Sequence, residues 1–76
     1  MRITPIPEFP DIFVIDPDVY PDSRGFFFEL YHDGRYRGAI PERFVQDNVS
    51  RSSHGVIRGL HYQIGRPQGK LVTVLE

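Results

Sequence analysis

Prolines and glycines recur so often along this chain that no long helix fits between them. The sequence contains seven residues of each type, and both interrupt helices and mark turns. The short segments between them are rich in β-branched and aromatic residues, which favour strands. The sequence therefore predicts an all-β fold, with a loop or a single helical turn near residues 33–41 as its only other element.

The predicted strands recur at regular spacing and are separated by turns rich in glycine and serine. They cover residues 12–15, 26–31, 43–50, 56–64 and 70–76, with turns over 21–25, 52–55 and 65–69. Prolines 5, 7 and 10 keep the first ten residues extended and out of a central strand. The last strand is apolar up to its end, and an unpaired apolar edge invites aggregation. We therefore expect residues 1–76 to be a single partial domain, although a small sheet closed by residues 70–76 is the other interpretation.

Composition excludes several classes of protein. Nine basic and ten acidic residues give a net charge of −1, which provides no field for nucleic acid or an anionic membrane. Apolar runs are too short for a membrane span, and no signal peptide is visible, so we expect a cytoplasmic protein. The absence of cysteine excludes disulfides and thiolate metal sites. A chain of this size has a marginal core, so we expect a partner subunit or further sequence to complete it.

Four clusters of chemically distinctive residues occur in a fixed order. They are DSRGFFFE at 22–29, QDNVSRS at 46–52, RGLHYQ at 58–63 and GKLV at 69–72. Together they resemble the first part of the dTDP-4-dehydrorhamnose 3,5-epimerase family, and the resemblance runs from about Asp11 onward. It implies a cupin-like jelly-roll β-barrel, of which this chain is the amino-terminal part, and a homodimer whose amino-terminal strands cross to the neighbouring subunit.

His61 and Lys70 are the candidate catalytic residues. A short turn joins their predicted strands, so a hairpin would bring the two side chains together. A neutral imidazole can remove a proton next to a ketone, and an ammonium group can stabilise the enolate that forms. The resemblance implies these roles in converting dTDP-4-dehydro-6-deoxy-D-glucose to dTDP-4-dehydro-L-rhamnose. From residue type alone, a structural histidine and a solvated lysine are the commoner interpretations.

Arg24 and Arg58 are the candidate ligands of the pyrophosphate. Guanidinium groups bind phosphate oxygens through paired hydrogen bonds, and the sequence has no glycine-rich phosphate loop that would serve instead. Arg58 and His61 lie three positions apart, so strict strand alternation places them on opposite faces. Gly59 between them would permit a bulge that brings both into one site.

The remaining candidate residues would bind the nucleoside. By resemblance, Phe26 stacks on the thymine ring, and three polar side chains hydrogen-bond the base edge or the deoxyribose: Glu29, Gln46 and Asn48. The alternation of residues 43–50 places Gln46 and Asn48 on one face, although a solvent-facing polar stripe is the ordinary explanation.

No metal and no cofactor is expected. Metal-binding cupins begin their ligand set with two histidines separated by one residue, and His32, His54 and His61 form no such pair. His54 is expected in an exposed turn, and no role is evident for His32. The family's aspartate and tyrosine, which orient the base and return a proton, match no residue here, so the 76-residue chain alone is expected to be inactive.

Three alternatives remain open. The first is a non-catalytic β-sheet module that dimerises through its edge strands, with no affinity for dTDP and no sensitivity to Arg24→Ala or Arg58→Ala. The second is a related deoxysugar epimerase that inverts a single carbon. The third is a metal-dependent cupin, such as a dioxygenase or a sugar isomerase.

Overall fold

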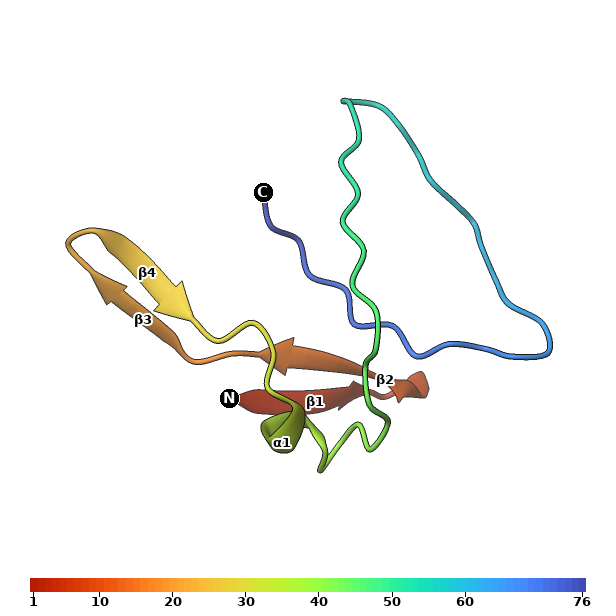
Figure 1. Cartoon of the computed structure of the whole chain (residues 1–76), viewed down its shortest axis with the longest axis horizontal. Helices are drawn as coiled ribbons and strands as arrows, with labels where there is room; N and C mark the ends of the chain where they lie inside the picture. The colour runs from red at the N-terminus through yellow and green to blue at the C-terminus, as the bar shows by residue number, and fades with distance from the viewer. The chain divides into compact units, whose positions relative to one another are not determined.

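The computed structural model describes residues 1–76. The chain divides into two compact units, Met1–Arg43 and Phe44–Glu76. Every strand and the one helix belong to the first unit (Figure 1). No helix combines the length and the apolar character needed to cross a membrane.

The first hairpin joins strands β1 (Arg2–Ile6) and β2 (Phe9–Asp16) in antiparallel pairing. Ile3 lies opposite Ile15, and these two side chains share a half-buried face with Phe13. The register shifts between Pro5 and Ile6, where proline supplies no backbone N–H to the ladder. The period-two burial follows the strand geometry, because successive side chains point to opposite faces, and the apolar Ile12 and Val14 lie on the exposed face.

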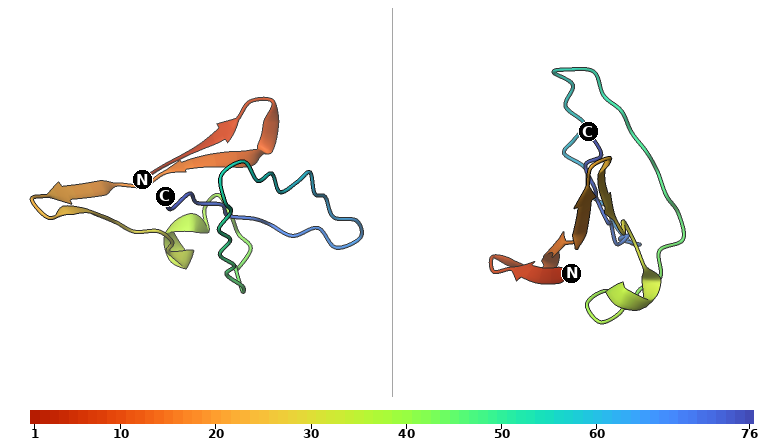
Figure 2. Two further views of the ribbon diagram at one scale, coloured as in Figure 1. Left: turned by 90° about the horizontal axis from the view of Figure 1, so that it is seen from above. Right: turned by 90° about the vertical axis from the view of Figure 1, so that its left-hand side faces the viewer.

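The second hairpin joins strands β3 (Val19–Asp22) and β4 (Gly25–Phe28). Its two-residue turn is closed by Asp22, whose Oδ1 accepts a hydrogen bond from the Arg24 backbone N–H at 2.8 Å. Gly25 follows the turn with a φ of 137°, a conformation that favours glycine. The two hairpins form separate two-stranded sheets (Figure 2), so every strand is an edge strand.

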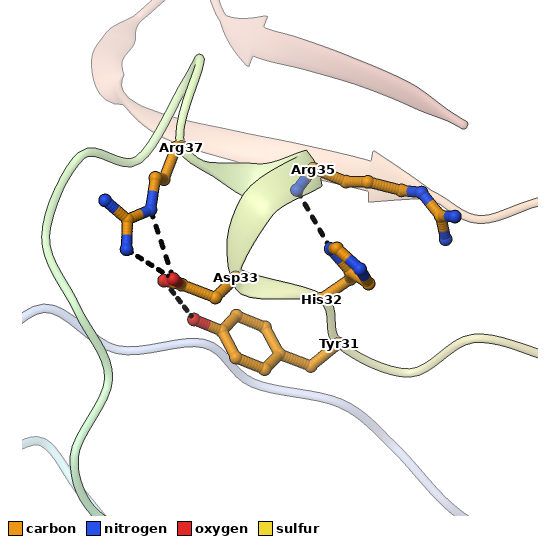
Figure 3. Close-up of polar contacts among 5 residues, drawn as sticks. All are labelled: Tyr31, His32, Asp33, Arg35 and Arg37. Carbon is orange, nitrogen blue, oxygen red and sulfur yellow. Dashed lines mark hydrogen bonds and ion pairs between the residues drawn. The ribbon is translucent and has the colours of Figure 1, made fainter.

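Helix α1 (Asp33–Tyr36) is a single turn held by side chains at both ends. His32 caps its start, because Nδ1 accepts a hydrogen bond from the Arg35 N–H at 3.1 Å. Asp33 accepts hydrogen bonds from Arg37 Nε at 3.1 Å and Nη2 at 2.5 Å, and from the Tyr31 hydroxyl at 3.2 Å (Figure 3). These contacts offset the weak stability of so short a helix.

Tyr36 is the buried centre of the first unit. Its side chain is 4% exposed, and it is the one buried residue of the chain. The hydroxyl donates to the Leu30 carbonyl at 3.1 Å, and the ring meets Tyr31 edge to face with centroids 5.2 Å apart. Burial, with a smaller contribution from Glu29, raises the pKa of Tyr36. One aromatic side chain thus anchors the helix to the segment that precedes it.

The structure confirms the predominance of strands and several local predictions. The strand predicted over 12–15 lies within β2, and the strand predicted over 26–31 overlaps β4 at residues 26–28, while residues 29–31 form no strand. The turn over 21–25 and the helical turn within 33–41 are present. The structure contains two additional strands, β1 and β3.

The strands predicted over 43–50, 56–64 and 70–76 are absent from the structure, so those predictions are wrong here. The second unit is irregular, with a turn at His54–Gly55 and a bend at residues 64–66. Most of its apolar side chains are exposed, including Leu60 at 104% and Ile57 at 90%, while Phe44 and Leu71 are half-buried. A strand is held by hydrogen bonds to a neighbour and by burial of one face, and neither is available to these segments. No barrel is closed.

Candidate functional site

Arg24 lies at the tip of the β3–β4 hairpin, where Asp22 holds it. Nη2 lies 2.7 Å from Asp22 Oδ2, and the arginine side chain is 89% exposed. The hydrogen bond from the Arg24 side chain is the largest of the causes that lower the pKa of Asp22. The carboxylate thus fixes one edge of the guanidinium group, and the other edge faces solvent.

Phe26 presents an open aromatic face two residues after this arginine. It is 70% exposed and stacks on Phe28, with centroids 5.9 Å apart and ring planes at 17°. Tyr20 and Phe27 meet at 6.4 Å, and strand alternation places them on the opposite face of the hairpin. An exposed ring beside a cation is chemically suited to a nucleobase attached to a phosphate.

Glu29 is engaged within the first unit by Arg35. The two side chains form an ion pair, and the hydrogen bond to Glu29 raises the pKa of Arg35 above its usual value. Both residues line a recess of about 450 Å³ whose aromatic wall is made by Tyr20 and Phe27. Arg35 carries no signal in the sequence, because its partner Glu29 lies six residues earlier and outside any helix.

Gln46 and Asn48 lie on the same side of the second unit, although no strand forms there. The Gln46 amide Nε2 donates to Asn48 Oδ1 at 3.1 Å. The two side chains therefore share one side, as predicted, while the strand that was the basis of the prediction is absent. The pair is exposed, so its remaining donors and acceptors face solvent.

Arg58 is drawn back to the preceding segment by a turn. The Val56 N–H donates to the Ser53 carbonyl at 3.2 Å, and Gly55 within this turn has a φ of 84°. Arg58 Nε then donates to Ser52 Oγ at 2.7 Å, and Nη2 donates to the Arg51 carbonyl at 3.1 Å. The predicted turn over 52–55 is confirmed, and Ser52 and Arg51 are partners that the sequence analysis missed.

His61 and Lys70 are not brought together by a hairpin, so the hairpin prediction is wrong for this structure. His61 is exposed and makes no hydrogen bond or ion pair. Lys70 Nζ donates to Gln68 Oε1 at 2.8 Å, and the Gln68 N–H donates to Gln63 Oε1 at 2.8 Å. The bend between His61 and Lys70 is therefore held by the side chains of Gln63 and Gln68. No ladder of backbone hydrogen bonds forms on either side of it.

Gly59 departs from regular strand geometry between Arg58 and His61. Its φ is 150°, a value that favours glycine. The structure contains no group of three or more histidine, aspartate or glutamate side chains placed to hold a metal ion.

Comparison with known protein families places the chain among the dTDP-sugar isomerases. The matching family model, described as dTDP-4-dehydrorhamnose 3,5-epimerase, covers residues 7–76, which include all four sequence clusters. The chain belongs to the dTDP-4-dehydrorhamnose 3,5-epimerase family. No solved structure gives a significant match.

Curated relatives extend this likeness over most of the chain. A dTDP-4-dehydrorhamnose 3,5-epimerase of Pseudomonas aeruginosa is 55% identical over 65 residues, covering 83% of this chain and 36% of that protein. The protein of the same name from Neisseria gonorrhoeae is 52% identical over 67 residues, covering 87% of this chain and 20% of its own length. A dTDP-4-dehydrorhamnose 3-epimerase of Streptomyces niveus is 40% identical over 76 residues, covering 96% of this chain and 36% of that protein. The chain spans about a third of the first relative and a fifth of the second.

Proposed function

We propose that residues 1–76 form the substrate-binding front part of a dTDP-4-dehydrorhamnose 3,5-epimerase. The observation that carries the proposal is the family match over residues 7–76. The substrate is a dTDP-linked 4-keto-6-deoxy sugar, and the product is dTDP-4-dehydro-L-rhamnose. No cofactor takes part, and a cytoplasmic location belongs to the same proposal.

The fold proposed for the intact protein is a cupin-like jelly-roll barrel, with residues 1–76 as a partial domain. Its strands would include the segments 43–50, 56–64 and 70–76 once neighbouring strands are present. The exposure of Val45 at 89%, Ile57 at 90% and Val74 at 84% supports this proposal, because such side chains stabilise a fold only when a partner surface covers them. Here the intact protein means the product of the whole gene.

The proposed chemistry begins when His61 removes a proton next to the sugar ketone. Lys70 then stabilises the negative charge that develops on the carbonyl oxygen. Neutral imidazole is suited to this transfer near neutral pH. Once residues 56–64 and 70–76 pair as strands, the turn over 65–69 would place both side chains at one site.

The nucleotide is proposed to bind through two arginines and a set of nucleoside contacts. Arg24 and Arg58 each keep one edge of the guanidinium group open to solvent, and this edge can hold a phosphate oxygen pair. The nucleoside contacts are a ring stack on Phe26, a hydrogen bond accepted by Glu29, and hydrogen bonds with Gln46 and Asn48. Glu29 would exchange its ion pair with Arg35 for the ligand, which costs little because the pair is exposed.

A homodimer is part of the proposal. Both strands of the β3–β4 hairpin are edge strands, and Phe26 and Phe27 are 70% and 69% exposed. Exposed apolar edges of this kind add to a neighbouring sheet readily. Arg24, Phe26 and Glu29 would then complete the site of the neighbouring subunit.

The decisive experiment follows the proton transfer in the intact protein. Incubation with the keto sugar in D₂O, read by NMR, is expected to place deuterium at the inverted carbons. His61→Ala should lower turnover by about 10²–10⁴-fold and Lys70→Ala by about 10²–10³-fold. His54→Ala, in an exposed turn, is the matched control and should retain turnover. Full activity in His61→Ala would overturn the proposal.

A single-carbon epimerase is the second candidate. The similarity to the Streptomyces niveus 3-epimerase covers 96% of this chain, and this similarity supports inversion of a single carbon as the alternative function. The same D₂O experiment separates the two functions, because deuterium at one carbon indicates a 3-epimerase and deuterium at both carbons indicates a 3,5-epimerase.

A further inference from the structure

The feature that extends the proposed function is the way the second unit holds Arg58. The turn from Ser53 to Val56 reverses the chain, so Arg58 returns alongside residues 51 and 52. Its guanidinium group donates from Nε to Ser52 Oγ at 2.7 Å and from Nη2 to the Arg51 carbonyl at 3.1 Å. Both distances lie within the ordinary hydrogen-bond range.

These two bonds use one particular edge of the guanidinium group. In arginine, Nε and Nη2 lie along one side of the planar group, while Nη1 and Nη2 form the fork at its end. The protein therefore occupies the side edge and leaves the end fork free. Such a fork is the part of arginine that binds two oxygens of one phosphate.

We propose that Ser52 is a positioning residue that aims the end fork of Arg58 at the substrate's pyrophosphate. This inference rests on the proposed function. A free arginine side chain loses rotamer freedom when it binds, and a side chain that is already held loses less. The Arg51 carbonyl assists, but it belongs to the backbone, so Ser52 is the partner that a substitution can remove.

Ser53 provides the matched comparison with Ser52. The two serines are adjacent and both exposed, but the Ser53 hydroxyl makes no hydrogen bond to Arg58. The contribution of Ser53 to the turn is its backbone carbonyl, which an alanine substitution preserves. A difference between Ser52→Ala and Ser53→Ala therefore reports the hydroxyl bond and not the fold of the turn.

The first test reads the Arg58 side chain directly, without substrate. In the intact protein labelled with ¹⁵N at arginine Nε, the Arg58 Nε–H should exchange slowly with solvent. Ser52→Ala should accelerate this exchange, and Ser52→Thr, which keeps a hydroxyl, should restore protection. Ser53→Ala should leave it unchanged. Equal exchange in the parent protein and in Ser52→Ala would overturn the proposal.

The second test measures binding of thymidine diphosphate by calorimetry. Ser52→Ala should weaken affinity about fivefold, the effect of one hydrogen bond, and should raise KM with kcat retained. Affinity for thymidine, which has no phosphate, should not change. In the background of Arg58→Ala, the further substitution Ser52→Ala should cause no additional loss.

These measurements show whether the proposed nucleotide site or only the proposed role of Ser52 is wrong. If Arg58→Ala leaves thymidine diphosphate affinity intact, the nucleotide site is wrong and the role of Ser52 is wrong with it. If Arg58→Ala weakens binding while Ser52→Ala does not, the nucleotide site stands and the positioning role is overturned.

Discussion

At the scale of residues, three of the five arginines in the first unit pair with nearby carboxylates. Arg24 binds Asp22, Arg35 binds Glu29, and Arg37 binds Asp33. Exposed pairs of this kind contribute little to stability, so a ligand phosphate can replace a carboxylate at small cost. Arg24 was predictable from its cluster. The ion pairs were not, because they form only where the chain turns back locally, and the clusters do not predict those turns.

The Asp22–Arg24 pair predicts a specific pH dependence for the β3–β4 turn. Because the folded pKa of Asp22 lies below its ordinary value of 3.8, the pair stabilises the turn above that pH. This stabilisation is lost as the pH falls through the lower, folded pKa. A ¹³C NMR titration of the Asp22 carboxyl group in the intact protein measures it. Arg24→Ala should return the Asp22 pKa toward its usual range, whereas Arg2→Ala should not alter it; an unchanged titration in Arg24→Ala would contradict the assignment.

At the scale of elements, the two hairpins show how far local sequence determines structure. The turn before Gly25 and the apolar run in β2 were predictable, because turn chemistry and the strand preference of β-branched and aromatic residues act over a few residues. Strand β1 was missed because Pro5 argues against a central strand, and β3 was missed because Pro21 and Asp22 were assigned to the turn. Both strands lie at sheet edges, where a residue without an N–H is tolerated.

Gly25→Ala is expected to destabilise the β3–β4 hairpin. Its φ of 137° is strained for any residue with a Cβ, at a cost of about 1–3 kcal/mol. Gly38→Ala is the matched control, since an added Cβ there meets no atom within 4 Å, and it should change stability by less than about 0.5 kcal/mol. Urea unfolding of the intact protein measures both free energies. Equal values for the two variants would show that the strain is absent.

At the scale of the whole molecule, the second unit marks the limit of prediction from this sequence. Alternation of apolar residues predicted strands over 43–50, 56–64 and 70–76, but alternation alone supplies no neighbour, and no strand forms there. Leu60, Tyr62 and Val72 remain at least 83% exposed, so no burial offsets the entropy of ordering them. The same limit applies to the candidate site. Contacts across a local turn form, such as the hydrogen bond from Arg58 to Ser52. A contact between His61 and Lys70 requires their segments to pair as strands, and it does not form.

The partial-domain proposal predicts different behaviour for the 76-residue chain and the intact protein. The chain alone should bind the dye ANS strongly, because its apolar side chains are exposed, and should show no epimerase turnover. The intact protein should bind little dye and turn over the keto sugar. Fluorescence titration and the NMR assay measure the two properties. Turnover by the 76-residue chain at the rate of the intact protein would contradict the proposal.

The burial of Tyr36 against Tyr31 gives the molecule a built-in optical signal. The chain has four tyrosines and no tryptophan, so tyrosine dominates its near-ultraviolet circular dichroism. A ring held edge to face in a fixed, asymmetric setting gives a band there, whereas freely rotating rings give almost none. Loss of that band on heating would therefore follow the melting of helix α1 itself, without any label.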